Sequence, residues 1–209
     1  YNIFTHEAKN WGTPLIPSNL PCFTVDTKRG RLMATGSFET VLLWDTIDKK
    51  VRYAGCPPKG WVFWERSMLL DEATGIFWSV DSRSPDKKIR FLSFDPEFNT
   101  FERHEVTPPE NPYDKAVALT RGHTEQPAVD GWYYWATWNG GFFRFKPGDK
   151  KGPVVESLGV TWDKGRDCKA IVLDPMGRYV YYLPMGPFAP VIQYDVKTRT
   201  KKVLCWLQQ

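Results

Sequence analysis

The sequence predicts an all-β protein built from four copies of a four-stranded antiparallel unit of about fifty residues. Three observations support this: an aromatic position that recurs at nearly constant spacing, an Asp–Gly turn in every copy, and an unusual composition. The 209 residues include ten Trp, nine Tyr and thirteen Phe, together with 16 Gly and 17 Pro. Many aromatics and many turn formers are typical of short strands rather than long helices.

The recurring aromatic position defines one hairpin in each copy. Trp44, Phe94, Phe145 and Tyr194 are 50, 51 and 49 residues apart. An apolar residue stands two positions before each of them, and this spacing places both side chains on one face of a strand. A polar turn and a second apolar run follow, as in VLLWDTIDKKVRYAG. Each such segment therefore predicts a β-hairpin.

A second hairpin precedes each of these and shares one kind of turn. An apolar strand ends in an Asp, and a Gly follows within a few residues; the Asp residues are Asp26, Asp71, Asp130 and Asp174, and the Gly residues are Gly30, Gly75, Gly131 and Gly177. An Asp side chain accepts hydrogen bonds from turn backbone, and Gly adopts positive φ without strain. A single active site does not need four copies, so we assign these Asp residues a structural role.

Two hairpins per copy predict sixteen strands. Their expected ranges are 21–26, 31–36, 40–45 and 50–55 in the first copy, 66–71, 76–81, 89–95 and 101–106 in the second, 125–130, 132–137, 141–146 and 153–158 in the third, and 168–174, 179–184, 190–196 and 201–207 in the fourth.

One such sheet cannot bury both faces, but sheets stacked around an axis can, which predicts a β-propeller. The blades are expected at about 21–60, 61–110, 117–160 and 168–207, after an N-terminal extension, 1–20. Large aromatics are expected to pack between blades; examples are Trp78, Tyr133, Trp135 and Tyr181.

The segment LDPMGRYVYYLP, followed by VIQYDVKTRTKKVL, resembles the repeats of bacterial propellers with six to eight blades. This group includes gluconolactonase-like, YVTN-type and oligosaccharide-lyase-type proteins. The resemblance extends over all four copies and implies a fold rather than an activity. The WD-repeat and kelch signatures are absent from the sequence.

Two arrangements of the ring remain open at this point. The four blades form a closed four-bladed ring, or they are part of a larger propeller of six to eight blades. The second arrangement is favoured by the resemblance, and the chain is then a fragment, a self-pairing subunit or the partner of another chain. An open arc exposes two apolar blade faces, which association should cover.

The net charge and the cysteine spacing argue against several classes of function. The net charge is only +4, and the lysine pairs 49–50, 87–88, 150–151 and 201–202 fall in separate predicted loops or hairpins. We therefore expect no nucleic-acid partner and no membrane insertion. Cys22, Cys56, Cys168 and Cys205 show no metal-binding spacing and are expected to be reduced. A chain that begins at Tyr1 is expected to have been trimmed, so a cytoplasmic or a secreted location is open.

Candidate site residues lie in the loops that enter the innermost strands, because propeller sites generally lie at the axis. His123, between Arg121 and Glu125, is the candidate catalytic residue, with those two neighbours as its partners. A His can act as a base near neutral pH, and an Arg can neutralise a carboxylate. The expected substrate-binding residues are Trp64, Glu65, Arg66, Arg166, Asp167 and Lys169. Ser18 and Asn19 belong to the same loop set.

No cofactor is expected, and calcium is the alternative. Oligosaccharide lyases of the resembled group use a histidine-rich metal site, which three His residues do not reproduce. Calcium, as in gluconolactonase-like propellers, would need Asn19, Glu65, Glu125 and Asp167 to converge.

The sequence thus predicts a propeller directed at carbohydrate, in particular acidic sugars, through binding or lyase-type chemistry at the axial channel. The alternative is a non-catalytic scaffold that completes a larger propeller by oligomerisation. Whether the chain is an enzyme is left undecided.

Overall fold

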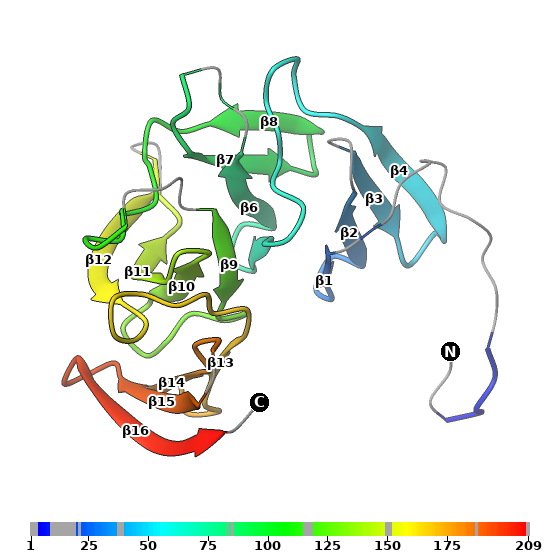
Figure 1. Ribbon diagram of the computed structural model, residues 1–209. Helices are drawn as coiled ribbons and strands as arrows, with labels where there is room; N and C mark the ends of the chain where they lie inside the picture. The colour runs from blue at the N-terminus through cyan, green and yellow to red at the C-terminus, as the bar shows by residue number, and fades with distance from the viewer. Residues whose placement is uncertain are drawn as a thin grey trace.

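The computed structural model describes residues 4–8, 20, 22–36, 40–82, 84, 86–114, 119–148, 152–186 and 188–207. Those residues form four separate four-stranded antiparallel sheets and contain no helix, as predicted. Among the described residues there is therefore no helix that could cross a bilayer. The sheets follow one another along the chain, and each is a simple meander of consecutive strands (Figure 1).

The strands of blade 1 are β1 (Cys22–Asp26), β2 (Arg31–Thr35), β3 (Val41–Asp45) and β4 (Lys50–Gly55). Blade 2 contains β5 (Leu69–Asp71), β6 (Ile76–Asp81), β7 (Arg90–Asp95) and β8 (Thr100–Arg103). Blade 3 contains β9 (Thr120–His123), β10 (Tyr133–Thr137), β11 (Gly141–Lys146) and β12 (Val154–Val160). Blade 4 contains β13 (Ile171–Leu173), β14 (Tyr179–Tyr182), β15 (Ala189–Asp195) and β16 (Thr200–Leu207).

The predicted Asp–Gly turns are confirmed. Asp26 accepts a hydrogen bond from the backbone N–H of Arg29, and Asp174 accepts one from Tyr179. The four turn glycines, Gly30, Gly75, Gly131 and Gly177, have φ of 62°, 82°, 76° and 70°. This conformation is unfavourable for residues with a Cβ, which explains why glycine recurs in these turns.

Three apolar layers lie between successive blades and form the core. The layer between blades 1 and 2 is built around Met33, Leu43, Phe77 and Phe94. The layer between blades 2 and 3 holds the predicted aromatics Trp78, Tyr133 and Trp135, together with Phe91, Phe143 and Phe145. The layer between blades 3 and 4 holds Tyr134, Phe142, Tyr182, Ile192 and Tyr194. Stacking therefore buries the large side chains that one sheet alone would expose.

Polar contacts near the inner strands tie each blade to the next. The Thr24 hydroxyl donates to the carbonyl of Met68 over 3.1 Å, and the Trp64 indole Nε1–H donates to the carbonyl of Thr120 over 2.9 Å. Between blades 3 and 4, the Val129 N–H donates to the carbonyl of Gly177 over 2.9 Å. These bonds fix the order of the inner strands β1, β5, β9 and β13 around the axis.

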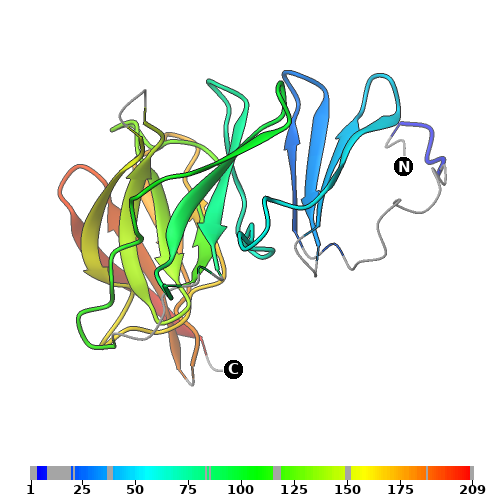
Figure 2. The same cartoon turned by 90° about the horizontal axis from the view of Figure 1, so that it is seen from above.

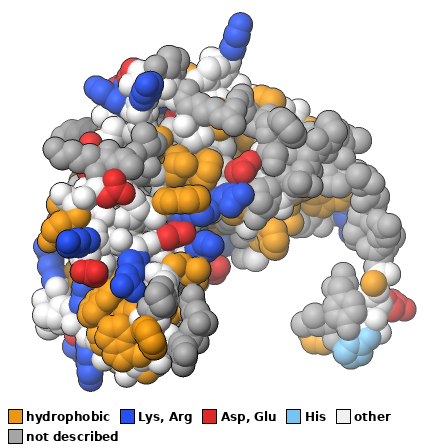
Figure 3. Space-filling view, in the orientation of Figure 1, with side chains coloured by type: hydrophobic (Ala, Val, Ile, Leu, Met, Phe, Trp, Pro, Cys, Tyr) orange, Lys and Arg blue, Asp and Glu red, His pale blue; other side chains and the backbone are white. Residues whose placement is uncertain are grey.

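The four blades form an open arc, with blade 1 at one end and blade 4 at the other (Figures 1 and 2). The innermost strand of each blade faces the hollow side of the arc. On the face seen in Figure 3, basic and acidic side chains are interspersed rather than gathered by sign.

One predicted strand was misplaced. The inner strand of blade 3 was expected at 125–130, but β9 is Thr120–His123. Hydrogen bonds from Thr124 N–H to the Tyr134 carbonyl and from Ala128 N–H to the Trp132 carbonyl show that the hairpin itself is as predicted. Between these bonds the chain bulges, because Pro127 has no N–H to pair. His123 therefore ends a strand instead of lying in a loop before it.

The other inner strands are shorter than predicted, since β5 begins at Leu69 and β13 covers only Ile171–Leu173. All four cysteines are free: Cys168 is buried, Cys22 half-buried, and Cys56 and Cys205 exposed.

Candidate functional site

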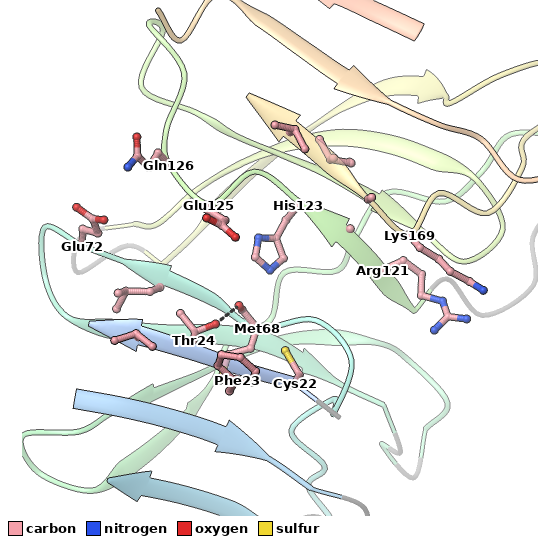
Figure 4. A pocket seen from close by; sticks show the side chains of 16 residues that line it. Cys22, Phe23, Thr24, Met68, Glu72, Arg121, His123, Glu125, Gln126 and Lys169 are labelled. Atoms are coloured by element: carbon pink, nitrogen blue, oxygen red, sulfur yellow. Dashed lines mark hydrogen bonds between the residues drawn. The ribbon is translucent and has the colours of Figure 1, made fainter. Parts of the chain in front are cut away.

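The inner strands of all four blades line an open cavity of about 590 Å³ on the hollow side of the arc (Figure 4). Blade 1 contributes Cys22 to Val25, and blade 2 contributes Met68, Leu70 and Glu72. Blades 3 and 4 contribute Arg121, Gly122, His123, Glu125, Gln126 and residues 169–172. A cavity of this size is large enough for a small organic ligand or a sugar ring.

Gly122 brings blades 3 and 4 close together at this cavity. A Cβ at this position would lie 3.0 Å from the backbone carbonyl carbon and oxygen of Lys169. Glycine therefore allows β9 to approach the segment before β13, and the side chains of Arg121, His123 and Lys169 become neighbours along one wall. Nothing in the local sequence pattern indicates a packing role for this glycine.

Arg121 is buried and held on two sides. Its guanidinium Cζ lies 4.1 Å from the centroid of the Trp138 ring, and its Nε is 3.6 Å from Oδ1 of Asp167. Neither Arg121 Nε nor Asp167 Oδ1 has a hydrogen-bond partner. The ring and the carboxylate thus position the guanidinium, and Asp167 balances part of its charge.

His123 stacks on the Trp135 ring, with 5.2 Å between ring centroids, and its Nδ1 lies 3.1 Å from the Thr124 carbonyl oxygen. Burial lowers the pKa of His123 below its usual value, although the backbone carbonyls of Thr124 and Met68, which would accept hydrogen bonds from a protonated ring, oppose this effect. The imidazole is therefore neutral at neutral pH. When Nδ1 carries the hydrogen, Nε2 offers a lone pair that can accept a proton.

Charge is distributed unevenly along the cavity (Figure 4). Arg121 and Lys169 lie toward one end, while Glu72, Glu125 and Gln126 lie toward the other, with His123 between the two groups. A ligand with a carboxylate at one end and hydroxyl groups at the other matches this arrangement, because carboxylates pair with cations and hydroxyls donate to carboxylates.

Four of the nine predicted site residues line the cavity: Arg121, His123, Glu125 and Lys169. Asp167 reaches it only through its contact with Arg121. The other four lie elsewhere, with Trp64 packed against the core between blades 2 and 3. Glu65 and Arg66 pair with each other over 3.6 Å, and the Arg166 side chain lies beside Gly186.

Several lining residues were missed by sequence reasoning. Glu72 directly follows Asp71, and it was passed over as part of the predicted turn. Phe23, Met68 and Gln126 also line the cavity, and nothing in their local pattern distinguishes them from ordinary strand or loop residues. Only the packing of blades around the axis gathers them.

No group of three or more His, Cys, Asp or Glu side chains that could hold a metal ion occurs within the described ranges. Of the residues considered for calcium, Glu65, Glu125 and Asp167 do not form such a group, and Asn19 lies outside the described residues.

His104 stacks on Trp78, with 4.8 Å between ring centroids, and its Nε2 is 2.9 Å from the Ser93 hydroxyl.

No protein-family model matches the sequence, and no curated protein matches it significantly. Solved structures do match. The dihydro-heme d1 dehydrogenase NirN, in complex with DHE, has a TM-score of 0.64 at 9% identity over 90% of this chain and 36% of its own. The structure of the RRP9 WD40 repeats has a TM-score of 0.62 at 10% identity, over 90% of this chain and 51% of the RRP9 chain.

An oligogalacturonate lyase in complex with manganese gives a TM-score of 0.57 at 10% identity over 88% of this chain and 52% of its own. The chain has a β-propeller fold. It spans only 36%, 51% and 52% of the length of these three structures. At these identities the likeness concerns the fold alone, and the predicted fold class is confirmed.

Proposed function

We propose that this propeller binds an acidic carbohydrate in the axial cavity. The observation that carries the proposal is the convergence of Arg121, His123 and Lys169, from two neighbouring blades, on the wall of one cavity. The carboxylate of a uronic acid would pair with Arg121 and Lys169, and its hydroxyls would donate to Glu125 and Glu72.

The same arrangement suits lyase-type chemistry. His123, neutral at neutral pH, would remove the proton on the carbon next to the carboxylate, whose charge Arg121 balances. The electron pair forms a carbon–carbon double bond with the next ring carbon of the same sugar, as the bond from that carbon to the bridging oxygen breaks. His123 keeps the abstracted proton, and the leaving oxygen takes a proton from water. Cleavage would thus leave one unsaturated sugar end.

Titration calorimetry and thermal-shift measurements with galacturonate oligomers and with the matching neutral galactose oligomers test the binding. We expect the acidic ligand to bind and to raise the melting temperature, since it stabilises only the folded state. Arg121→Gln and Lys169→Gln should weaken binding at least tenfold, while Lys197→Gln, an exposed position in the β15–β16 turn, should not. If no sugar of either kind binds, the proposal is wrong.

Lyase activity is tested separately, through the ultraviolet absorbance of the unsaturated product. His123→Ala should abolish the product signal while the acidic ligand still binds. Binding without product in the wild type would leave a carbohydrate-binding propeller that is not an enzyme.

The second candidate function is a non-catalytic scaffold. It is favoured by apolar side chains left exposed on the two end blades, such as Phe23 in blade 1 and Val172 in blade 4. Propellers made of WD40 repeats are among the structural neighbours, and their fold fits this role equally well. A chain that binds none of the sugars above but assembles with itself or another protein would support the scaffold.

A further inference from the structure

Each interface between successive blades is built around the same pair of positions. One is the recurring aromatic position of the sequence, Phe94, Phe145 or Tyr194, which faces the preceding blade. The second position belongs to the preceding blade and lies on the second strand of that blade. It is paired with the residue that comes one position before the recurring aromatic of the same blade. The register places Met33 opposite Leu43, Trp78 opposite Ser93, and Tyr134 opposite Arg144.

These two positions meet in all three interfaces. Trp78 contacts Phe145 edge to face, with 5.3 Å between the ring centroids. The ring centroids of Tyr134 and Tyr194 lie 5.6 Å apart. Met33 and Phe94 belong to the same buried layer. All six side chains are at most 3% exposed, so the pair is the centre of each interface.

The two ends of the arc each carry one half of this pair. Trp44 occupies the recurring aromatic position in blade 1, the first blade of the arc, and its side chain is partly exposed. Tyr181 lies opposite Gln193 in blade 4, the last blade of the arc, and is also partly exposed. The Gln193 side-chain amide donates a hydrogen bond to the Tyr181 hydroxyl over 2.9 Å and holds the ring in place.

Further apolar side chains surround each half. Val25 is paired with Leu32, and Leu32 with Trp44, so the three share a face, and Phe23 lies on it at 67% exposure. In blade 4, Val172 is paired with Tyr181 and is 62% exposed. Part of the blade 1 face is already covered, since Ala34 and Leu42 are buried and Leu20 packs against them. The exposed apolar residues around this part, and those of blade 4, mark an association surface.

We propose that a second copy of this chain covers both faces, with Tyr181 of each copy packed against Trp44 of the other. The two faces are the two halves of an interface that the chain already forms three times, and every copy carries one of each. Such a head-to-tail contact forms a closed ring when the rotation that relates the copies brings the last copy back to the first, and an open filament otherwise. The chain spans 51%, 52% and 57% of three matched propellers, so two copies supply about one full ring.

Two copies contribute eight blades, which is within the range that propellers adopt. The contact would also complete the axial cavity, whose wall includes Phe23 and Val172 from the two end blades. This inference does not depend on the ligand, so it stands or falls separately from the carbohydrate proposal.

Light scattering coupled to size-exclusion chromatography tests the pairing on the 209-residue chain. We expect a mass of twice the 24.2 kDa of one chain. Trp44→Glu alone and Tyr181→Lys alone should each give a folded monomer, as checked by circular dichroism. The double variant should regain the dimer, because the introduced carboxylate and ammonium then face each other at both contacts. Phe98→Glu, in the β7–β8 turn, is the matched control and should remain dimeric.

A wild-type monomer at micromolar concentration overturns the proposal, and the two faces then have another occupant, such as further blades or a different protein. A dimer that both single variants leave intact also overturns it, because the interface then lies elsewhere. A ladder of larger masses that both variants abolish would show a head-to-tail contact that does not close, and it overturns the closed pair.

Discussion

The guanidinium of Arg121 lies over the indole ring of Trp138, with 4.1 Å between Cζ and the ring centroid. Arg121 is on the inner strand β9, and Trp138 follows β10 beside it. The ring therefore fixes the direction of the one buried cation that lines the described part of the cavity. A positioning residue of this kind acts on ligand binding through Arg121 and need not touch the ligand.

Trp138→Leu should weaken binding of an acidic sugar several-fold, because a stacked cation of this kind gains about 0.5 to 2 kcal/mol from the ring. Trp138 is 51% exposed, so the melting temperature should change little. Titration calorimetry with the acidic and the neutral sugar gives the comparison. Equal affinity of wild type and variant for the acidic sugar would show that Trp138 does not position Arg121.

Stability should fall as the solution is acidified through the usual titration range of histidine. Burial lowers the pKa of His123 and of His104, whereas in the unfolded chain a His titrates near about 6.5. Below that pH the unfolded chain binds protons that the folded chain does not, which favours unfolding. The melting temperature should therefore drop between about pH 7.5 and pH 5.5.

His123→Phe should make this drop smaller, and the double variant with His104→Phe should make it smaller still. Carboxylates such as Asp45, Asp195 and Glu156, whose pKa is lowered by hydrogen bonds, lose their contribution only at more acidic pH. His6→Phe, at an exposed position, controls for the loss of an imidazole. A pH dependence equal in all variants would contradict the assigned environment of these two half-buried histidines.

Phe145 is a focus of the layer between blades 2 and 3. Its ring centroid lies 5.3 Å from that of Trp78, 4.7 Å from Phe91 and 5.4 Å from Trp135. Phe145→Ala should lower the free energy of unfolding by about 3 to 5 kcal/mol, as expected for removal of a buried aromatic side chain. Urea denaturation measures the change. Phe98→Ala, at a residue 75% exposed, should change it by less than about 0.5 kcal/mol.

Two turn glycines of blade 3 should differ sharply in their tolerance of alanine. Gly131 and Gly140 have nearly equal φ, 76° and 77°. A Cβ on Gly131 meets only Lys146 Nζ at 3.7 Å, so Gly131→Ala should cost about 1 to 2 kcal/mol of backbone strain. A Cβ on Gly140 would overlap the backbone nitrogen of Arg166, which cannot move aside cheaply.

Gly140→Ala should therefore shift the thermal midpoint much further than Gly131→Ala, or prevent folding. Differential scanning calorimetry of the two variants under one condition checks this. Equal shifts would mean that strain alone, and not the approach of the 165–166 segment, requires glycine at position 140.

The sequence was most informative where one structural requirement repeats. The recurring aromatic position, Trp44 to Tyr194, and the turn glycines identified the hairpins because each blade solves the same packing and turn problem. It was least informative where a local irregularity intervenes. The bulge around Pro127 displaced β9 from its predicted range, and so changed His123 from a loop residue to the end of a strand.

The candidate site, too, was predicted only in part from the sequence. Arg121, His123, Glu125 and Lys169 were predicted from their place before inner strands, and they line the cavity. Glu72, Phe23 and Gln126 were not predicted, and Trp64 was expected there but packs against the core between blades 2 and 3. Their positions depend on contacts between blades, which are distant in the chain, and the catalytic and binding roles remain predictions.

By itself the sequence determined the repeated strand–turn pattern, because alternating apolar residues and Asp–Gly turns act within a few residues of one another. Only the tertiary structure decided which side chains share the axial cavity and that the arc is open, with Trp44 and Tyr181 at its two ends. Those features arise from the angle and closeness at which whole sheets stack. That geometry is set by side-chain packing between blades and by close approaches such as the one at Gly122.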